Sequence, residues 1–234
     1  MTTLMGGETA VPSLATYPYR YGMKGELMPG IKLPLKSARS ARGPKQLEVV
    51  GIGGALDPNS SCLAALRIAA LEMSRRGAEV SIVDLREAEF PMYIPGTAPP
   101  EQIDQFLQMV RRADALIWAT PSYCGAMCGA FTNALDWLAR LRDNNFTALS
   151  GKVVGFIVSS EDDASPVVNM MELSARALGA TSISSHAVLH ELLDPKEKDV
   201  SDDKDVRTTL RRLARDIVRA VRNTSERGGR PEGK

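Results

Sequence analysis

Five short apolar runs alternate with segments of helical period after residue 46, and this alternation constrains the fold more than any other feature. We predict strands over 47–53, 79–83, 115–120, 151–160 and 181–189, and helices over about 63–77, 101–113, 129–142, 165–178 and 205–223. Strands that alternate with helices predict a parallel sheet with helices on both faces. The natural order for five such units is 2-1-3-4-5, a doubly wound α/β sheet that binds ligands at the carboxyl ends of its strands.

The first 45 residues do not share this pattern. They contain five prolines and show no sustained period, although they hold three of the five tyrosines of the chain, Tyr17, Tyr19 and Tyr21. We predict an extended N-terminal arm over 1–45, one folded domain over 46–223 and a polar C-terminal tail over 224–234. The arm is either a mobile tail or a segment that wraps a neighbouring subunit, and the sequence leaves both possibilities open.

Composition excludes several classes of function. The chain has 234 residues and a hydrophobic content of 44%, which is enough for a substantial core. Its net charge of +1 gives no reason to expect nucleic acid as a partner. No apolar run approaches the ~20 residues that span a bilayer, and the N-terminus lacks a signal-peptide pattern. We therefore expect a cytoplasmic protein with no membrane partner.

A metal site is poorly supplied with ligands. Cys124 and Cys128 have C-x3-C spacing, but the chain has only three cysteines and two histidines, His186 and His190. A closed zinc site needs four ligands, so no metal is expected. We predict that the two cysteines are partly buried thiols and that the histidines are structural.

The loop after the first predicted strand could bind an anion. Gly53 and Gly54 allow close backbone approach, and Ser60 or Ser61 could cap the following helix and donate a hydroxyl to a phosphate. The alternative is an ordinary strand-to-helix turn with a serine cap. The loop is not G-x-G-x-x-G and lacks the P-loop lysine, which disfavours a classical dinucleotide fold or an ATPase.

Two stretches together resemble the NADPH-dependent FMN reductase family of flavodoxin-like enzymes. The first is GGALDPNSSCLAAL at 53–66, and the second is ATPSYCGAMCGAFTNALDWL at 119–138. The second carries the family pattern of Pro-x-Tyr-x-Gly, a glycine four residues on, and Asn-Ala-Leu-Asp-Trp on the next helix. The resemblance covers about residues 47–190.

This resemblance implies an FMN-dependent enzyme with NAD(P)H as co-substrate. Hydride would pass from the nicotinamide to the flavin and then to a second acceptor by a ping-pong route. The acceptor would be a small molecule: a flavin, a quinone, an azo compound or a metal oxyanion. Positioning would carry most of the catalysis, so no catalytic side chain is expected. The family is generally dimeric or tetrameric, which implies a homodimer or homotetramer with the arm against a neighbour.

The resemblance also implies which residues hold the cofactor. Ser60 and Ser61, with the backbone of Gly54, would bind the FMN phosphate. The isoalloxazine ring would be lined, largely by backbone groups, by Pro121, Ser122, Tyr123, Cys124 and Gly125. On the helix that follows, Asn133, Trp137 and Arg140 are expected to form subunit contacts.

The chain departs from the family pattern at several positions. Ala55 and Asp57 stand where a serine and an arginine are usual, Thr132 replaces a lysine, and an acidic run over 160–163 replaces a glycine-rich loop. The alternative reading is therefore a non-catalytic flavin-binding or electron-transfer protein of the same fold. A hydrolase is disfavoured because no G-x-S-x-G motif is present.

Overall fold

A five-stranded parallel sheet forms the centre of the computed structural model, which describes residues 31–35, 46–141, 147–190, 200 and 203–228. Its strands are β2 (Leu47–Gly53), β3 (Ala78–Asp84), β4 (Ala115–Tyr123), β6 (Val153–Ser160) and β7 (Thr181–His190). They lie in the order β3-β2-β4-β6-β7, and every neighbouring pair is parallel. This order is the 2-1-3-4-5 arrangement predicted from the sequence, and the prediction is confirmed.

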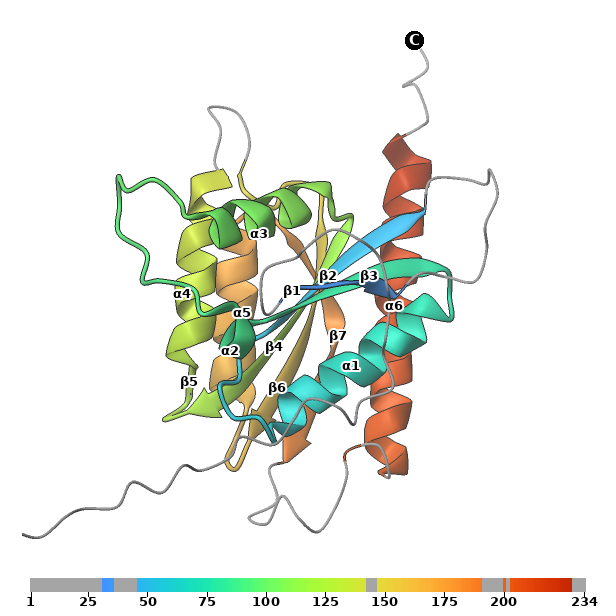
Figure 1. Ribbon diagram of the computed structural model, residues 1–234. Helices are drawn as coiled ribbons and strands as arrows, with labels where there is room; N and C mark the ends of the chain where they lie inside the picture. The colour runs from blue at the N-terminus through green and yellow to red at the C-terminus, as the bar shows by residue number, and fades with distance from the viewer. Residues whose placement is uncertain (1–30, 36–45, 142–146, 191–199, 201–202, 229–234) are drawn as a thin grey trace, which may run out of the picture.

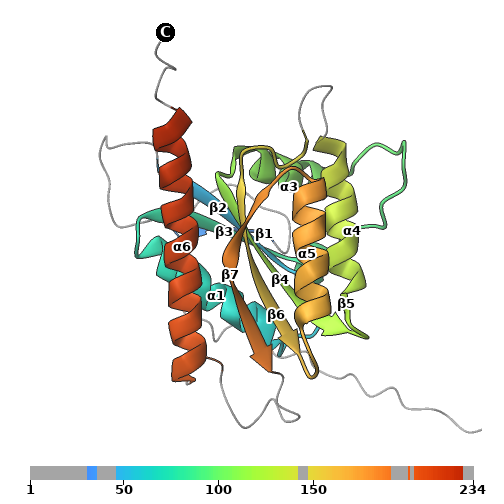
Figure 2. The ribbon, with the colours of Figure 1, turned by 180° about the vertical axis from the view of Figure 1, so that it is seen from behind.

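Helices cover both faces of the sheet (Figures 1 and 2). On one face lie α1 (Ser61–Ser74) and α6 (Lys204–Gly228), and on the other lie α3 (Glu101–Arg112), α4 (Gly129–Leu138) and α5 (Ser165–Ala177). Alternate side chains of β4 serve the two layers: Ile117 joins the cluster under α1 and α6, and Trp118 joins the cluster under the other three helices. Burial on both faces explains why the central strands read as nearly continuous apolar runs.

Part of the predicted N-terminal arm belongs to the sheet. Residues Ile31–Leu35 form β1, which pairs antiparallel with the outer edge of β3. The strand contains Pro34, which cannot donate to a ladder and is confined to edge positions of this kind. The remainder of the predicted arm, 1–30 and 36–45, lies outside the described residues.

Three segments differ in detail from the prediction. The last helix, α6, continues to Gly228 instead of ending at 223, and residues 229–234 lie outside the described part of the chain. The predicted loop over 85–100 contains a short helix, α2 (Leu85–Ala88), and a 3-10 turn, η1 (Ala139–Leu141), follows α4.

The largest difference from the sequence prediction concerns β4. The strand was expected to end at 120, but it continues through Pro121 to Tyr123 and then turns back as β5 (Ala126–Met127). The turn residues Cys124 and Gly125 have φ values of 53° and 72°. Two consecutive left-handed residues are typical of a type I′ hairpin, so the predicted loop is a tight β-hairpin.

Candidate cofactor-binding site

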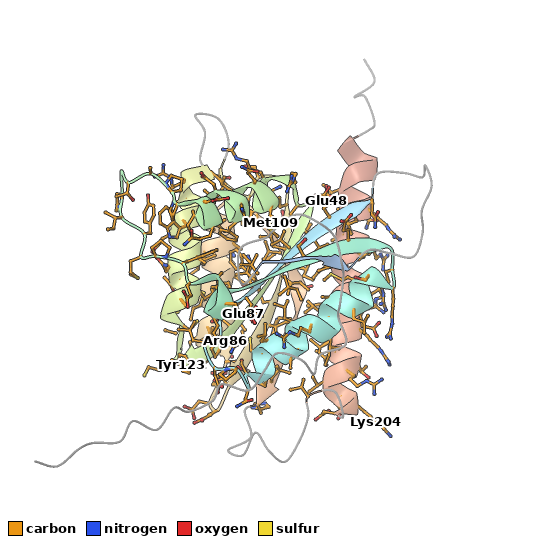
Figure 3. The ribbon with its side chains drawn as sticks, in the orientation of Figure 1. Glu48, Arg86, Glu87, Met109, Tyr123 and Lys204 are labelled. Atoms are coloured by element: carbon orange, nitrogen blue, oxygen red, sulfur yellow. The ribbon has the colours of Figure 1, made fainter. Side chains whose placement is uncertain are left out.

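Three segments leave the sheet together at the carboxyl ends of its central strands. Gly53 of β2 is in register with Ala119 of β4, and Pro121 of β4 is in register with Ser159 of β6. The loop 54–60, the β4–β5 hairpin and the acidic run after β6 therefore begin at neighbouring positions on one edge. The carboxyl edge of a doubly wound sheet is where such folds bind their ligands. Figure 3 shows Tyr123 at this end of the molecule, with Arg86 and Glu87 of α2.

Ser60 is the clearest ligand-directed feature of the loop after β2. It occupies the N-cap position of α1 but makes no capping hydrogen bond with its side chain. The residue is only 7% exposed, and its Oγ has no hydrogen-bond partner. A buried hydroxyl without a partner is costly unless a ligand or water satisfies it. Because it lies at the positive end of a helix of 14 residues, an anion is the ligand that best fits it.

The backbone of Gly54 is bonded to two other segments of the chain, and its role at a phosphate stays a prediction. Its N–H donates to the carbonyl oxygen of Ala119 at 2.8 Å, and its own carbonyl accepts from the thiol of Cys128 at 2.9 Å. A Cβ at this position would lie 2.7 Å from Cβ of Phe131. Glycine is required here for close packing against α4, and its backbone N–H is already used within the protein.

The hairpin presents the predicted ring-binding residues at the surface. Pro121 is buried and Ser122 is half-buried, whereas Tyr123, Cys124 and Gly125 are exposed. Tyr123 is 54% exposed, which is high for a side chain of its size and polarity. The structure thus places the five residues on the end of one strand and its turn, and their role at a flat ring stays a prediction.

Thr120 and Cys128 brace the base of the hairpin. The hydroxyl of Thr120, which is fully buried, donates to the carbonyl of Pro121 at 3.0 Å and accepts from the N–H of Cys128 at 3.2 Å. Cys128 also bonds Gly54, so it connects the hairpin to the loop after β2. Sequence reasoning missed both positioning roles, because the partners are defined only once β2 and β4 are adjacent.

Asn133, Trp137 and Arg140 contact a loop of their own chain. Asn133 accepts from the N–H of Tyr93 at 2.8 Å through its Oδ1 and donates to the carbonyl of Pro91 at 2.9 Å, and Trp137 Nε1 donates to the same carbonyl. Arg140 donates to the carbonyl of Thr97. These bonds fasten the loop 90–97 to α4. Asn133 and Trp137 are buried within their own chain, whereas Arg140 is exposed, so a subunit contact through Arg140 stays a prediction.

The two arginines near the end of β3, Arg67 and Arg86, form ion pairs with carboxylates. Asp84, at the end of β3, is 1% exposed and lies 3.7 Å from a guanidinium nitrogen of Arg67 and 4.0 Å from one of Arg86. Burial raises the pKa of Asp84, and Glu87 adds to this effect, while Arg86 and Arg67 act in the opposite direction. Arg86 also pairs with Glu87. These two arginines are thus engaged by carboxylates of the same edge.

The acidic run after β6 is partly a helix cap. Asp163 Oδ1 accepts hydrogen bonds from the N–H and the hydroxyl of Ser165 at the start of α5. These bonds lower the pKa of Asp163. Glu161 and Asp162 are exposed next to the hairpin strand. They give this side of the edge a negative rim.

The described residues of this edge could hold an anion and a planar ring. Ser60 offers an unsatisfied donor for a phosphate, and the exposed hairpin offers a turn and an aromatic side chain for a planar ring. Among the described residues, no group of three or more His, Cys, Asp and Glu side chains could hold a metal ion. His186 and His190 are exposed on β7, the edge strand.

Across the same described ranges, no helix is long and apolar enough to cross a membrane.

The chain is similar to known proteins over the region that holds these loops. The model of the family described as NADPH-dependent FMN reductase matches residues 47–192. An NAD(P)H-dependent FMN reductase from Pseudomonas aeruginosa is 30% identical over 112 residues, covering 47% of this chain and 59% of the relative. An NAD(P)H:quinone oxidoreductase from Solanum tuberosum is 30% identical over 100 residues, covering 40% and 50%. The chain therefore spans between half and three-fifths of the length of these curated relatives.

Solved structures share the fold at lower identity. RosB, solved with the bound intermediate 8-demethyl-8-formylriboflavin-5'-phosphate, superposes with a TM-score of 0.66 at 16% identity, covering 77% of this chain and 81% of that one. A flavodoxin from the domain Archaea superposes with a TM-score of 0.54 at 12% identity, covering 75% and 99%. These likenesses show a flavodoxin-like fold.

Proposed function

The chain belongs to the NADPH-dependent FMN reductase family, and on that premise we propose that it is an FMN-dependent NAD(P)H oxidoreductase. The observation that carries the proposal is the buried, unpartnered hydroxyl of Ser60, in a loop that leaves the same sheet edge as the exposed β4–β5 hairpin. FMN, when bound, supplies the hydride chemistry that links a nicotinamide to a second acceptor. The residues of this chain bind and position the reactants.

The phosphate end of the cofactor is assigned to the start of α1. Ser60 Oγ is the donor without a partner, and Ser61, the first residue of the helix, is half-buried beside it. The helix dipole favours an anion at this position. Gly54 supports the site by packing against Phe131.

The ring end is assigned to Pro121, Ser122, Tyr123, Cys124 and Gly125. A type I′ turn directs successive backbone groups outward, and those groups suit the polar edge of a flat ring. Tyr123 lays its aromatic body at the surface, where a planar ligand can pack against it. No acid–base pair is needed, because holding donor and acceptor close together carries most of the rate enhancement.

The second acceptor is proposed to be a small planar molecule such as a quinone or a flavin. The similar protein from Solanum tuberosum is named for a quinone and the one from Pseudomonas aeruginosa for FMN. A carrier that binds flavin without turnover is the competing function, and the departures at Ala55, Asp57 and 160–163 favour it.

The visible spectrum and flavin titration test the proposal. We expect purified protein to be yellow or to quench the fluorescence of added FMN on binding. Ser60→Ala should weaken FMN binding by roughly ten- to hundredfold, the value of one hydrogen bond to a charged group. Ser74→Ala, at the other end of α1, is the matched control. Absence of FMN uptake by the wild type would overturn the proposal.

Steady-state NADPH oxidation separates an enzyme from a carrier. With FMN bound, we expect turnover that depends on an added quinone or flavin and that gives parallel lines in double-reciprocal plots, as a ping-pong route requires. Flavin binding without any turnover would support the carrier.

We also propose that the protein is a homodimer or homotetramer whose arm contacts a neighbour. Residues 90–97 support this, because Met92 and Ile94 are exposed apolar side chains on a loop that α4 fastens. Light scattering of the full chain and of a chain lacking residues 1–30 tests the role of the arm. An identical mass for the two would contradict it.

A further inference from the structure

Asp57 lies in the loop that the proposed function assigns to the cofactor phosphate. We propose that its carboxylate acts as an internal anion that competes with this phosphate, so that the site distinguishes only weakly between FMN and unphosphorylated riboflavin. The inference rests on the proposed function. It concerns the affinity of the site for one part of the cofactor.

The carboxylate of Asp57 already accepts a hydrogen bond that an incoming anion could take. Its Oδ1 accepts from the N–H of Asn59 at 2.9 Å, and its backbone carbonyl accepts from the N–H of Ser60 at 3.2 Å. Pro58, between Asp57 and Asn59, has no N–H to donate. The N–H of Gly54 donates to Ala119. Three backbone donors of this loop, the N–H groups of Gly54, Asn59 and Ser60, are thus engaged by the chain itself.

The same loop holds a charge of the wrong sign for a phosphate. Residues 54–61 include no lysine, arginine or histidine, and Asp57 is their one charged side chain. Two arginines at this edge, Arg67 and Arg86, are engaged with Asp84. A phosphate bound at Ser60 would therefore gain a hydrogen bond and the helix dipole, while the carboxylate a few residues away repels it.

This balance predicts how the site treats two flavins that differ only in the phosphate. Ser60 Oγ and the start of α1 favour FMN, and Asp57 opposes it. We expect dissociation constants for FMN and riboflavin within about tenfold of each other, so that FMN exchanges with the solution.

Fluorescence titration of both flavins tests the inference in three proteins: the wild type, Asp57→Asn and Asp104→Asn. Asparagine keeps the side-chain oxygen that accepts from Asn59, so the substitution removes charge and preserves the turn. Asp104 is an exposed acid on α3, away from the loop, and serves as the control. Thermal unfolding checks that all three proteins are folded.

We expect Asp57→Asn to tighten FMN binding by roughly three- to tenfold and to leave riboflavin binding unchanged. Added salt should reduce the gain because it screens exposed charges. Asp104→Asn should bind both flavins as the wild type does. Unchanged FMN affinity in Asp57→Asn, or an equal gain for both flavins, would overturn the inference while the proposed function stands. Failure of all three proteins to bind either flavin would overturn the proposed function, and this inference with it.

Discussion

The thiol of Cys128 donates a hydrogen bond to the carbonyl oxygen of Gly54 at 2.9 Å, across 74 residues of sequence. The bond joins the first turn of the loop after β2 to the base of the β4–β5 hairpin. The two ends of the candidate site are therefore held against each other by the protein core, next to the ring of Phe131.

Gly54→Ala should destabilise the fold. The added methyl group would lie 2.7 Å from Cβ of the buried Phe131 and 3.1 Å from Sγ of Cys128, and overpacking of this kind costs about 1–3 kcal/mol. Thermal unfolding should show a loss of roughly 2–4 °C per kcal/mol for a domain of this size. Gly129→Ala is the control, because nothing lies within 4 Å of a Cβ there. Equal melting temperatures for the two variants would contradict the packing role.

Two substitutions of Cys124 should differ in their effect on the melting temperature. Its φ of 53° lies in the left-handed region, which costs most residues about 1 kcal/mol and glycine very little. We expect Cys124→Gly to match or exceed the wild-type melting temperature. Cys124→Val should lower it, because β-branched side chains fit this region worst. If both variants melt alike, the turn does not have the conformation described.

Asn133→Ala should release the loop 90–97. The substitution removes the acceptor for the N–H of Tyr93 and one donor to the carbonyl of Pro91, at a cost of about 1–3 kcal/mol. Hydrogen exchange measured by mass spectrometry should rise in peptides that cover this loop. Asp136→Ala, an exposed position of the same helix, should leave exchange there unchanged. Exchange that rises equally in both would argue against a specific fastening role.

Glu72 should make stability depend on pH in the acid range. Burial acts to raise the pKa of Glu72, but hydrogen bonds from Arg76, Arg211 and Arg75 outweigh it and hold the pKa below its ordinary value of 4.5. A carboxyl with a lowered folded-state pKa stabilises the fold above its unfolded pKa, and this stabilisation is lost as pH falls through the folded value.

Urea unfolding of Glu72→Gln measures this contribution. We expect a loss of roughly 2 kcal/mol at about pH 7, because the variant leaves Arg75 and Arg76, just after α1, and Arg211 of α6 without their shared carboxylate. The difference from the wild type should shrink below pH 4.5. Glu101→Gln, at the exposed start of α3, should show no such convergence. If the difference in unfolding free energy between wild type and Glu72→Gln stayed constant over the whole pH range, ionisation of Glu72 would not be its source.

If the proposed function holds, the exposed acids Glu161 and Asp162, here called the acidic rim, should make the enzyme select among electron acceptors by their charge. Glu161 and Asp162 are exposed directly after β6, whose Ser159 is in register with Pro121 of the hairpin strand. We expect a neutral quinone to have a higher kcat/KM than a sulfonated quinone. The double variant Glu161→Gln/Asp162→Asn should raise kcat/KM for the sulfonated quinone by roughly three- to tenfold and leave the neutral one unchanged.

The control for acceptor charge is the double variant Glu101→Gln/Asp104→Asn on α3, which removes the same formal charge from a different surface. It should leave both acceptors as they are in the wild type. Equal responses in the two double variants would mean that net charge, and not the rim, sets the preference.

The local pattern of apolar and polar residues was sufficient to predict the main architecture. Apolar runs flanked by helical periods predicted the sheet order, because each crossover in a parallel sheet needs a helix. The two motif stretches also predicted which loops lie at the candidate site, since the carboxyl ends of β2 and β4 are adjacent in that order. The residues of the hairpin, Pro121 to Gly125, lie together for this reason.

Details that depend on distant partners were not predictable. Nothing near Asn133 in sequence indicates that its amide bonds a loop about 40 residues earlier, so the sequence predicted a subunit contact for a side chain that is buried within its own chain. The packing role of Gly54 likewise depends on Phe131, which reaches it only after α4 is docked. Ile31, Leu33 and Leu35 alternate as a strand would, but five residues with a proline cannot reveal their partner.

The pairing of β1 with β3 has a consequence for how the N-terminal region can be studied. A truncation at residue 45 would remove five residues of the sheet along with the arm and leave the outer backbone groups of β3 without a ladder. Exposed strand edges of this kind recruit strands from other molecules. A change in the mass of that truncated protein could therefore come from the newly exposed edge of β3 or from the loss of the arm. A truncation before Ile31 keeps β1 and so tests the arm alone.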